Sequence, residues 1–214
     1  LSTAPNGPSI FIANEFFDAL PIQQVEKISG DWFERRIAAD GDSLLWVLTP
    51  ASSKLALADA ALLEKSQEGI LEISSASISV MGDIATHIKA HGGAALVIDY
   101  GYDKADFGNT LQALKNHQFH DVLNNSGKAD ITAHVNFENL KTIGEELKLQ
   151  TAGPIGQGHF LMQLGMGQRA EQLDAGRGDD SVLKALVRLT DPKEMGELFR
   201  VLAIANPPID LAGF

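Results

Sequence analysis

Short apolar runs alternate with polar turn segments in the first part of the chain. Residues 10–13 form a continuous apolar run of strand length. Residues 22–48 contain three β-prone runs, which are separated by Ser29-Gly30-Asp31 and by Asp40-Gly41-Asp42. Glycine and aspartate in such short separators are typical of hairpin turns. The pattern therefore predicts a buried strand, followed by a three-stranded antiparallel meander.

Helical spacing follows the predicted meander. Apolar residues recur at near-helical intervals over residues 54–65 and 77–90, and Gly92-Gly93 ends the second of these segments. The next run, AALVI at residues 94–98, is again continuous and apolar. A helix followed at once by such a run is typical of a helix-to-strand step in a parallel α/β sheet.

The remaining sequence predicts further elements of both kinds. Residues 102–136 are polar and rich in histidine. Helices are expected over residues 137–147, 160–173 and 181–189, and strands over residues 147–155 and 198–205. Because no segment has the length and composition of a linker, we predict one α/β domain over residues 1–214, with the meander inserted into it.

Composition and charge restrict the classes of partner. The chain has 214 residues, of which 44% are hydrophobic, as a packed domain requires. Its formal net charge of -11 disfavours binding to nucleic acid or to anionic membranes, and makes a basic protein the matched partner. The absence of cysteine excludes disulfides and thiolate chemistry. No apolar run approaches the roughly 20 residues of a membrane span.

Polar clusters follow two of the predicted strands. Asn14, Glu15 and Asp18 come after the first run, and Asp99 with Tyr100 comes after the run at residues 94–98. In α/β sheets, ligands bind beyond the carboxyl ends of the strands. A pair of carboxylates there could bind a metal, act as acid and base, or face a guanidinium, whose planar donors match carboxylates. Capping or solvating a turn remains the alternative for each acid alone.

Histidines and acids in the polar region suggest a metal site only weakly. The candidates are His117, His120, Asp121, Asp130 and His134. A zinc site needs three or four converging ligands, whereas here a polar loop separates the candidates and no H-E-x-x-H pattern occurs. We therefore assign no metal, and a metal-dependent hydrolase is the weakest of the functions considered.

The stretch GMGQRA at residues 165–170 matches a dinucleotide-binding fingerprint literally. That fingerprint has meaning only where a strand leads in and a full helix leads out. Here the stretch lies within the predicted helix 160–173, so we interpret the match as coincidence. The sequence also lacks a P-loop and a G-x-S-x-G elbow, which argues against common nucleotide triphosphatases and serine hydrolases.

Six segments together resemble the MidA family, in consistent order and over nearly the whole chain: FIANEFFDALPIQQ, WFER, GGAALVIDYGY, HQFHDVL, ADITAHVNF and MGELFRVLA. The resemblance implies a class I S-adenosylmethionine-dependent methyltransferase with a Rossmann-like, mostly parallel sheet. Residues 10–13 would be its fourth strand and residues 94–98 its fifth. Mitochondrial members of the family are complex I assembly factors that methylate an arginine of a complex I subunit, so the resemblance implies arginine methylation.

The resemblance also implies roles for the residues after the fourth strand. In arginine methyltransferases of this fold, acids at this position hold the substrate guanidinium beside the methyl donor. Glu15, with Asp18, would therefore be the catalytic pair that binds and orients the guanidinium. Asn14 would contact the methionine part of the cofactor, S-adenosyl-L-methionine.

Further substrate-binding residues follow from the same resemblance. Asp99, Tyr100 and His134 would border the substrate channel. Trp32 would belong to a family-specific flap formed by the meander. A packing role for Trp32 within the meander is equally open.

The sequence departs from the family in its cofactor site. The family's Gly-rich loop of the type E-L-G-P-G-R-G is not present here. We therefore expect this chain to be the C-terminal part of a longer methyltransferase and to be inactive alone. Its first strand would normally pair with a strand that is missing, which would leave an apolar strand at an exposed edge.

Three further points stay open at this level. The leading alternative to an enzyme is a non-catalytic assembly or binding module that retains only the peptide-binding part of the fold. The resemblance places such a protein in the bacterial cytoplasm or in the mitochondrial matrix. The oligomeric state is undetermined, and a homodimer is one alternative.

Overall fold

The computed structural model describes residues 5–51, 60–65, 67–116, 118–124, 127–175 and 179–214. The chain divides into two compact units, and the single domain expected over residues 1–214 stays a prediction. The first comprises Leu1–Phe17, Ile78–Lys104 and Val135–Phe214, and the second comprises Asp18–Ser77 and Ala105–His134. Each unit has its own sheets and is described by itself.

The first unit is built on a five-stranded sheet whose main path is β1-β6-β12-β11, with β10 pairing β6. The strands are β1 (Ser9–Asn14), β6 (Gly93–Tyr102), β10 (Val135–Asn136), β11 (Gln150–Gly156) and β12 (Phe199–Asn206). β1 and β10 run parallel to β6, whereas β12 runs antiparallel to both β6 and β11. The strands predicted over 10–13, 94–98, 147–155 and 198–205 are therefore present, and the predicted parallel step into residues 94–98 is confirmed.

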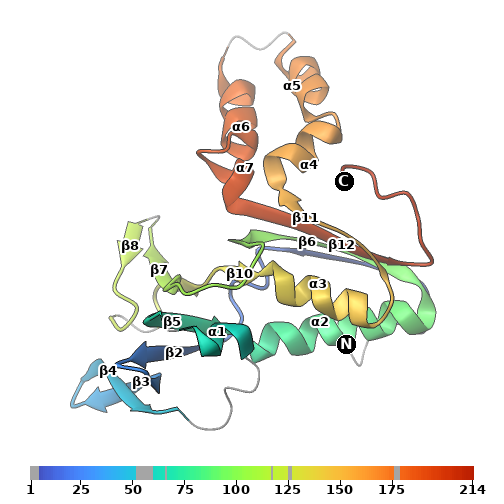
Figure 1. Ribbon diagram of the computed structural model, residues 1–214. Helices are drawn as coiled ribbons and strands as arrows, with labels where there is room; N and C mark the ends of the chain where they lie inside the picture. Colours follow the sequence, from blue (N-terminus) through green and yellow to red (C-terminus); the bar gives the residue numbers. More distant parts are fainter. Residues whose placement is uncertain (1–4, 52–59, 66, 117, 125–126, 176–178) are drawn as a thin grey trace. The chain divides into compact units, whose positions relative to one another are not determined.

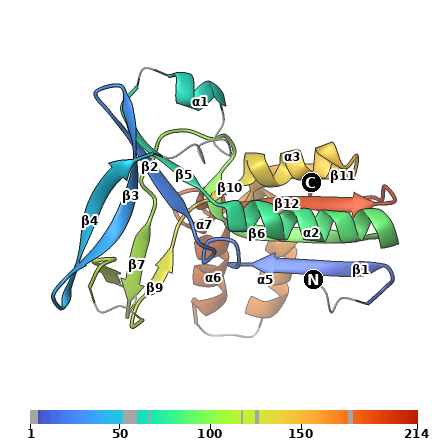
Figure 2. The same ribbon diagram turned by 90° about the horizontal axis from the view of Figure 1, so that it is seen from below.

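Two helices cover one face of this sheet (Figures 1 and 2). They are α2 (Ser75–His91) and α3 (Phe137–Glu146). Their apolar sides and the inner strands supply the buried core: Met81, Ile84, Ala85, Ile88, Ala95, Val97, Phe137, Leu140, Val201, Leu202, Ala203, Ile204 and Ala205. Because β12 is buried at nearly every position, it lies in the middle of this core.

Four shorter helices lie together beyond the end of β11 (Figure 1). They are α4 (Gln157–Gln163), α5 (Met166–Asp174), α6 (Ser181–Thr190) and α7 (Met195–Leu198). The single helix predicted over 160–173 is wrong, because Gly165 adopts a left-handed conformation (φ 86°) and separates α4 from α5. Within the described residues, no helix combines the length and apolar character needed to cross a membrane.

Strand β1 forms one edge of the first unit's sheet. Among the described strands it pairs with β6 alone. Its side chains Ile10 and Ile12 are 80% and 70% exposed. Ile10 and Ile12 lie on one face of this edge strand, so they leave apolar area in water along the edge of the sheet. The exposed apolar edge expected from the sequence is therefore observed.

The second unit contains the predicted meander and one further strand. Its four-stranded sheet has the order β4-β3-β2-β5. The strands are β2 (Gln23–Ile28), β3 (Asp31–Asp40), β4 (Ser43–Pro50) and β5 (Gly69–Ile73), all antiparallel to their neighbours. Of the helix expected over 54–65, α1 (Ala60–Glu64) is observed, and residues 54–59 lie outside the described residues.

A second small sheet in this unit was not predicted. It has the order β8-β7-β9, with β7 (Gln112–Lys115), β8 (Gln118–His120) and β9 (Asp130–Thr132). These strands have three or four residues and many polar side chains, so apolar periodicity does not reveal them. The inserted part of the chain is therefore larger than the meander, since it also includes Ala105–His134.

Gly93 gives a test of the pairing between β1 and β6. It has φ 120°, and a Cβ atom there would lie 2.0 Å from the carbonyl oxygen of Ser9. Gly93→Ala should therefore lower the free energy of unfolding by at least about 2 kcal/mol in urea titrations. Gly82→Ala is the matched control, because helical Gly82 has open space around it and should gain up to about 1 kcal/mol. Equal stability of the two variants would contradict the described pairing.

Candidate active site

The turn at residues 14–17 follows strand β1 directly. Asn14 ends β1 opposite Ile98, and the backbone N–H of Glu15 donates to the Ile98 carbonyl oxygen at 3.0 Å. Glu15 then adopts a left-handed backbone conformation with φ 47°, which non-glycine residues rarely adopt. The side chains of Asn14 and Glu15 are exposed. The chain thus reverses at Glu15 and leaves a carboxylate in solvent at the end of the strand.

Asp99 holds this turn from the neighbouring strand β6. Its side chain is fully buried. Its Oδ2 atom accepts hydrogen bonds from the backbone N–H groups of Phe16 (3.2 Å) and Phe17 (3.0 Å), and its Oδ1 atom accepts from that of Tyr100 (3.0 Å). Hydrogen bonds to a buried carboxylate are among the strong ones. Asp99 therefore acts on the position of Glu15 through the backbone of the turn.

Aromatic side chains of the first unit lie in the 14–17 turn and next to Asp99. Phe17 is 2% exposed, whereas Phe16 is 45% exposed, and the two rings meet edge-on with centroids 5.3 Å apart. Tyr100 is half-buried and packs edge-on against Phe199, at 5.4 Å between ring centroids. One ring anchors the turn in the core, and the exposed Phe16 lies next to Glu15 in the chain as an apolar surface.

The exposed carboxylate of Glu15 suits binding of a cation. Its side chain lies in solvent directly after β1. A guanidinium offers a planar set of donors that a carboxylate accepts in pairs. The fixed backbone beneath it limits the positions that such a cation could take.

Asp18 lies across the boundary between the two units. The first unit ends at Phe17 and the second begins at Asp18. The Asp18 side chain is 5% exposed, and its carbonyl oxygen accepts from the N–H of Ala133 at 3.0 Å. It lines a cavity of about 620 Å³ within the second unit. Glu15 and Asp18 are therefore described in separate units, and their pairing stays a prediction.

Trp32 packs inside the second unit. Its ring stacks on Phe107 with centroids 6.2 Å apart, and Lys27 Nζ lies 5.4 Å from its centroid. It also packs against the buried cluster formed by Val25, Leu62, Leu71 and Ile73. These contacts support the packing role that the sequence left open, and the role in substrate binding stays a prediction.

His134 is held near a buried polar network. Its backbone N–H donates to Thr110 Oγ1 at 2.8 Å. Glu72 organises the network, because its Oε1 atom accepts from Gln24 Nε2 at 2.7 Å and from the N–H of Thr110 at 2.9 Å. Burial lowers the pKa of His134 below its ordinary value, and the charge of Glu72 partly opposes this shift. The neutral form of His134 is therefore favoured in the folded protein.

The remaining metal and nucleotide candidates gain no support from the geometry. His117 lies outside the described residues. Within the described part of the chain, no group of three or more histidine and acidic side chains could hold a metal. Gly165 follows helix α4 rather than a strand, so the reading of GMGQRA as a coincidence is confirmed.

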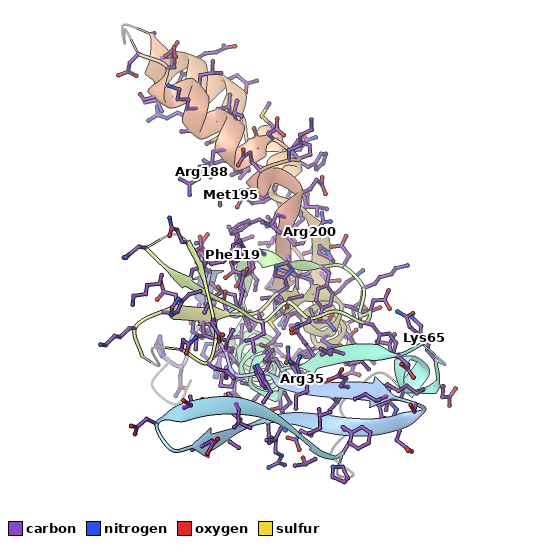
Figure 3. All side chains as sticks on the ribbon, turned by 90° about the vertical axis from the view of Figure 1, so that its left-hand side faces the viewer. Arg35, Lys65, Phe119, Arg188, Met195 and Arg200 are labelled. Carbon is purple, nitrogen blue, oxygen red and sulfur yellow. The ribbon has the colours of Figure 1, made fainter. Side chains whose placement is uncertain are left out.

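The sequence did not reveal the cavity lined by Asp18. One wall is the face of β3 and β4 that carries Arg35, Ile37, Leu44 and Trp46. Figure 3 shows the Arg35 side chain on the upper side of this sheet. The alternation of side chains along a strand predicts that Arg35 and Ile37 share a face. Which face lines a cavity depends on contacts with residues 111, 122 and 131–133, which are distant in the sequence.

We predict that Asp99→Asn loosens the 14–17 turn. The amide keeps one acceptor oxygen but places an NH₂ donor against backbone N–H groups, which should cost about 1–3 kcal/mol of unfolding free energy. Hydrogen exchange measured by NMR should become faster at Phe16, Phe17 and Tyr100. Asp83→Asn, at an exposed position of α2, is the control. Unchanged exchange at these amides would show that Asp99 does not hold the turn.

His134 should make stability depend on pH in one direction. Since its pKa in the folded state lies below the ordinary value of 6.5, the unfolded chain takes up the proton first as the pH falls. The contribution of His134 to the free energy of unfolding is complete above about pH 6.5 and is lost at lower pH. His134→Gln should therefore lose less stability than the wild type between about pH 7 and 5 in urea titrations. His159→Gln, at an exposed position, is the control, and parallel profiles for all three proteins would refute the assignment.

Comparisons with known proteins find one matching family and several similar sequences. A family model described as "Putative S-adenosyl-L-methionine-dependent methyltransferase" matches residues 1–155. The Danio rerio "Protein arginine methyltransferase NDUFAF7, mitochondrial" is 33% identical over 213 residues, which cover 96% of this chain and 49% of the relative. The Drosophila melanogaster homolog is 35% identical over 220 residues, which cover 95% and 48%. The chain spans about half the length of these curated relatives.

A solved structure extends the likeness to the fold. A Burkholderia thailandensis protein described as a "likely methyl transferase", bound to S-adenosyl-homocysteine, has a TM-score of 0.84 and 26% identity. The likeness covers 100% of this chain and 57% of that one. It confirms the predicted class I methyltransferase fold. Together these matches show that the chain belongs to a family of S-adenosyl-L-methionine-dependent methyltransferases, with S-adenosylmethionine as the family's cofactor.

Proposed function

We propose that the whole protein transfers a methyl group from S-adenosylmethionine to an arginine side chain of another protein. The observation that carries this proposal is the exposed Glu15 carboxylate, held on a left-handed turn by the buried Asp99. The relatives from Danio rerio and Drosophila melanogaster, which are named protein arginine methyltransferases, support the same reaction. The net charge of -11 favours a basic substrate.

Glu15 would bind the guanidinium of the substrate arginine. Two parallel hydrogen bonds from the guanidinium fix its plane against the carboxylate. The negative charge also draws the positive charge of the guanidinium toward the bonded nitrogens, which leaves electron density on the nitrogen to be methylated. S-adenosylmethionine supplies an electrophilic methyl group when it is bound. Glu15 then contributes position and charge rather than proton transfer.

The other residues would support this arrangement. Asp99 is a positioning residue, because its carboxylate already accepts three backbone hydrogen bonds. Asn14 fits one side of the cofactor site, because its amide is exposed at the carboxyl end of an edge strand. Asp18 would be the second acid, and Tyr100 would border the substrate channel.

Two residues of the second unit complete the proposed set. We assign His134 and Trp32 to the substrate side, where neutral His134 adds no positive charge that would repel an arginine. The named location of the relatives favours the mitochondrial matrix in a eukaryote, with the cytoplasm as the counterpart in a bacterium. Assembly of complex I would be the setting of the reaction.

We predict that Glu15→Gln lowers methyl transfer to arginine by roughly 10²-fold, because the neutral amide no longer polarises the guanidinium. The assay follows transfer of a labelled methyl group to protein arginine. Binding of S-adenosylmethionine, measured by calorimetry, should be unchanged. Glu146→Gln, at an exposed position of α3, is the control.

The outcome of this experiment separates the two functions considered. Full transfer by Glu15→Gln would remove Glu15 from the reaction. Absence of any transfer by the wild type, with intact binding of arginine peptides, would favour the non-catalytic binding module. Calorimetry of chain 1–214 alone tests whether these residues are sufficient for cofactor binding.

A further inference from the structure

The cavity of the second unit has the size and lining of a ligand site. Its volume of about 620 Å³ lies in the usual range of such sites, about 300–1,000 Å³. All its lining residues belong to one unit. The lining is mainly apolar and includes Ile37, Leu44 and Trp46. A few polar side chains, among them Asp18, Gln24 and Arg35, complete the lining.

Two buried polar atoms in this lining lack hydrogen bonds. Among the described residues, neither the Nη1 atom of Arg35 nor the Oε1 atom of Gln24 has a hydrogen-bond partner. Gln24 and Arg35 lie directly opposite each other on β2 and β3, so their side chains share one face of the sheet. A donor and an acceptor without partners therefore lie side by side. Buried polar groups in folded proteins are nearly always paired, so such a couple indicates a site for a polar ligand.

The surroundings of Arg35 show that its charge is already balanced. Its Nε atom lies 3.7 Å from Glu26 Oε2, and its guanidinium stacks over Trp46 at 4.7 Å from the ring centroid. Its neighbour Arg36 forms its own ion pair with Glu34 at 2.6 Å. The Nη1 donor thus needs an acceptor but not another negative charge. A neutral carbonyl oxygen meets that need.

The amide of Gln24 is fixed in orientation. Its Nε2 atom donates to Glu72 Oε1 at 2.7 Å and to Asn109 Oδ1 at 2.8 Å. The Glu72 carboxylate only accepts, so exchanging the amide oxygen and nitrogen of Gln24 would lose the hydrogen bond to it. The Oε1 atom is therefore held as an acceptor in the cavity wall, and it requires an N–H donor.

We infer that this cavity binds a peptide segment of the substrate protein. A peptide group offers one carbonyl acceptor and one N–H donor, which are the two groups that Arg35 and Gln24 lack. An apolar side chain of the same segment fits against Ile37, Leu44 and Trp46. A simple anion would satisfy Arg35 and leave Gln24 without a donor.

The inference rests on the proposed function for the identity of the peptide. The cavity would then select an apolar segment of the protein that carries the methylated arginine.

The test uses an arginine-centred peptide with leucines on both sides. Residues 1–214 contain two tryptophans, so NMR of this chain resolves one indole N–H signal for the cavity, from Trp46, and one for the packed Trp32. Addition of the peptide should shift the signal of Trp46 and leave that of Trp32 unchanged. Leu44→Ala and Arg35→Lys should each weaken peptide binding roughly tenfold in fluorescence anisotropy.

Leu45→Ala is the matched control. Leu44 and Leu45 are neighbours on β4 with similar exposure, 38% and 36%, but Leu45 points to the opposite face and does not line the cavity. Leu45→Ala should bind the peptide as the wild type does. Leu44→Ala changes a partly exposed side chain, so it keeps the test valid even if Arg35→Lys disturbs the fold.

The results distinguish this inference from the proposed function. Arginine methylation of the peptide with a silent Trp46 signal, or with equal affinity of Leu44→Ala and Leu45→Ala, overturns the cavity assignment alone. A Trp46 shift without methylation supports the cavity and counts against the reaction. A Trp46 shift caused by benzoate but not by the peptide would make the cavity a site for small acids. A Trp46 shift that follows protein concentration alone would mean self-association; either result overturns the inference.

Discussion

The candidate active site depends on one buried carboxylate, that of Asp99. It joins two strands, because it lies on β6 and accepts backbone hydrogen bonds from Phe16 and Phe17 in the turn after β1. The turn would otherwise bury N–H groups without acceptors, at a cost of about 1–3 kcal/mol for each. Glu15 can keep its left-handed conformation because its own N–H donates to the Ile98 carbonyl oxygen and Asp99 holds the two residues that follow it.

The described strands of the second unit do not extend the sheet of the first unit. They pair only with one another, so the meander and the β8-β7-β9 sheet form a separate body. The Glu72 carboxylate organises it, because it accepts hydrogen bonds from Gln24, Thr110 and Leu111. These hydrogen bonds fix the donor side of the Gln24 amide at the wall of the cavity.

The sequence predicted the elements with strong apolar patterns and missed those that depend on distant contacts. Strands β1, β6 and β12 were evident as apolar runs, whereas the short polar strands β7, β8 and β9 were not. The position of Glu15 directly after an apolar run was enough to suggest a site residue. The sequence did not reveal that Asp99 holds the turn, because the N–H groups of Phe16 and Phe17 that it binds lie more than eighty residues away. The opposition of Gln24 and Arg35 likewise depends on strand register, which side-chain type alone does not reveal.

Charge and shape would serve different parts of substrate recognition. An exposed carboxylate such as Glu15 selects a guanidinium over neutral side chains, but it attracts every arginine on a basic protein equally. A net charge of -11 raises the rate of encounter and adds no preference among them. Discrimination between arginines requires contacts with the residues beside them, made by groups that lose a hydrogen bond when the wrong segment is present. The Nη1 donor of Arg35 and the Oε1 acceptor of Gln24 lie beside an apolar wall and have no hydrogen-bond partners among the described residues. They would therefore lose hydrogen bonds when the wrong segment is present.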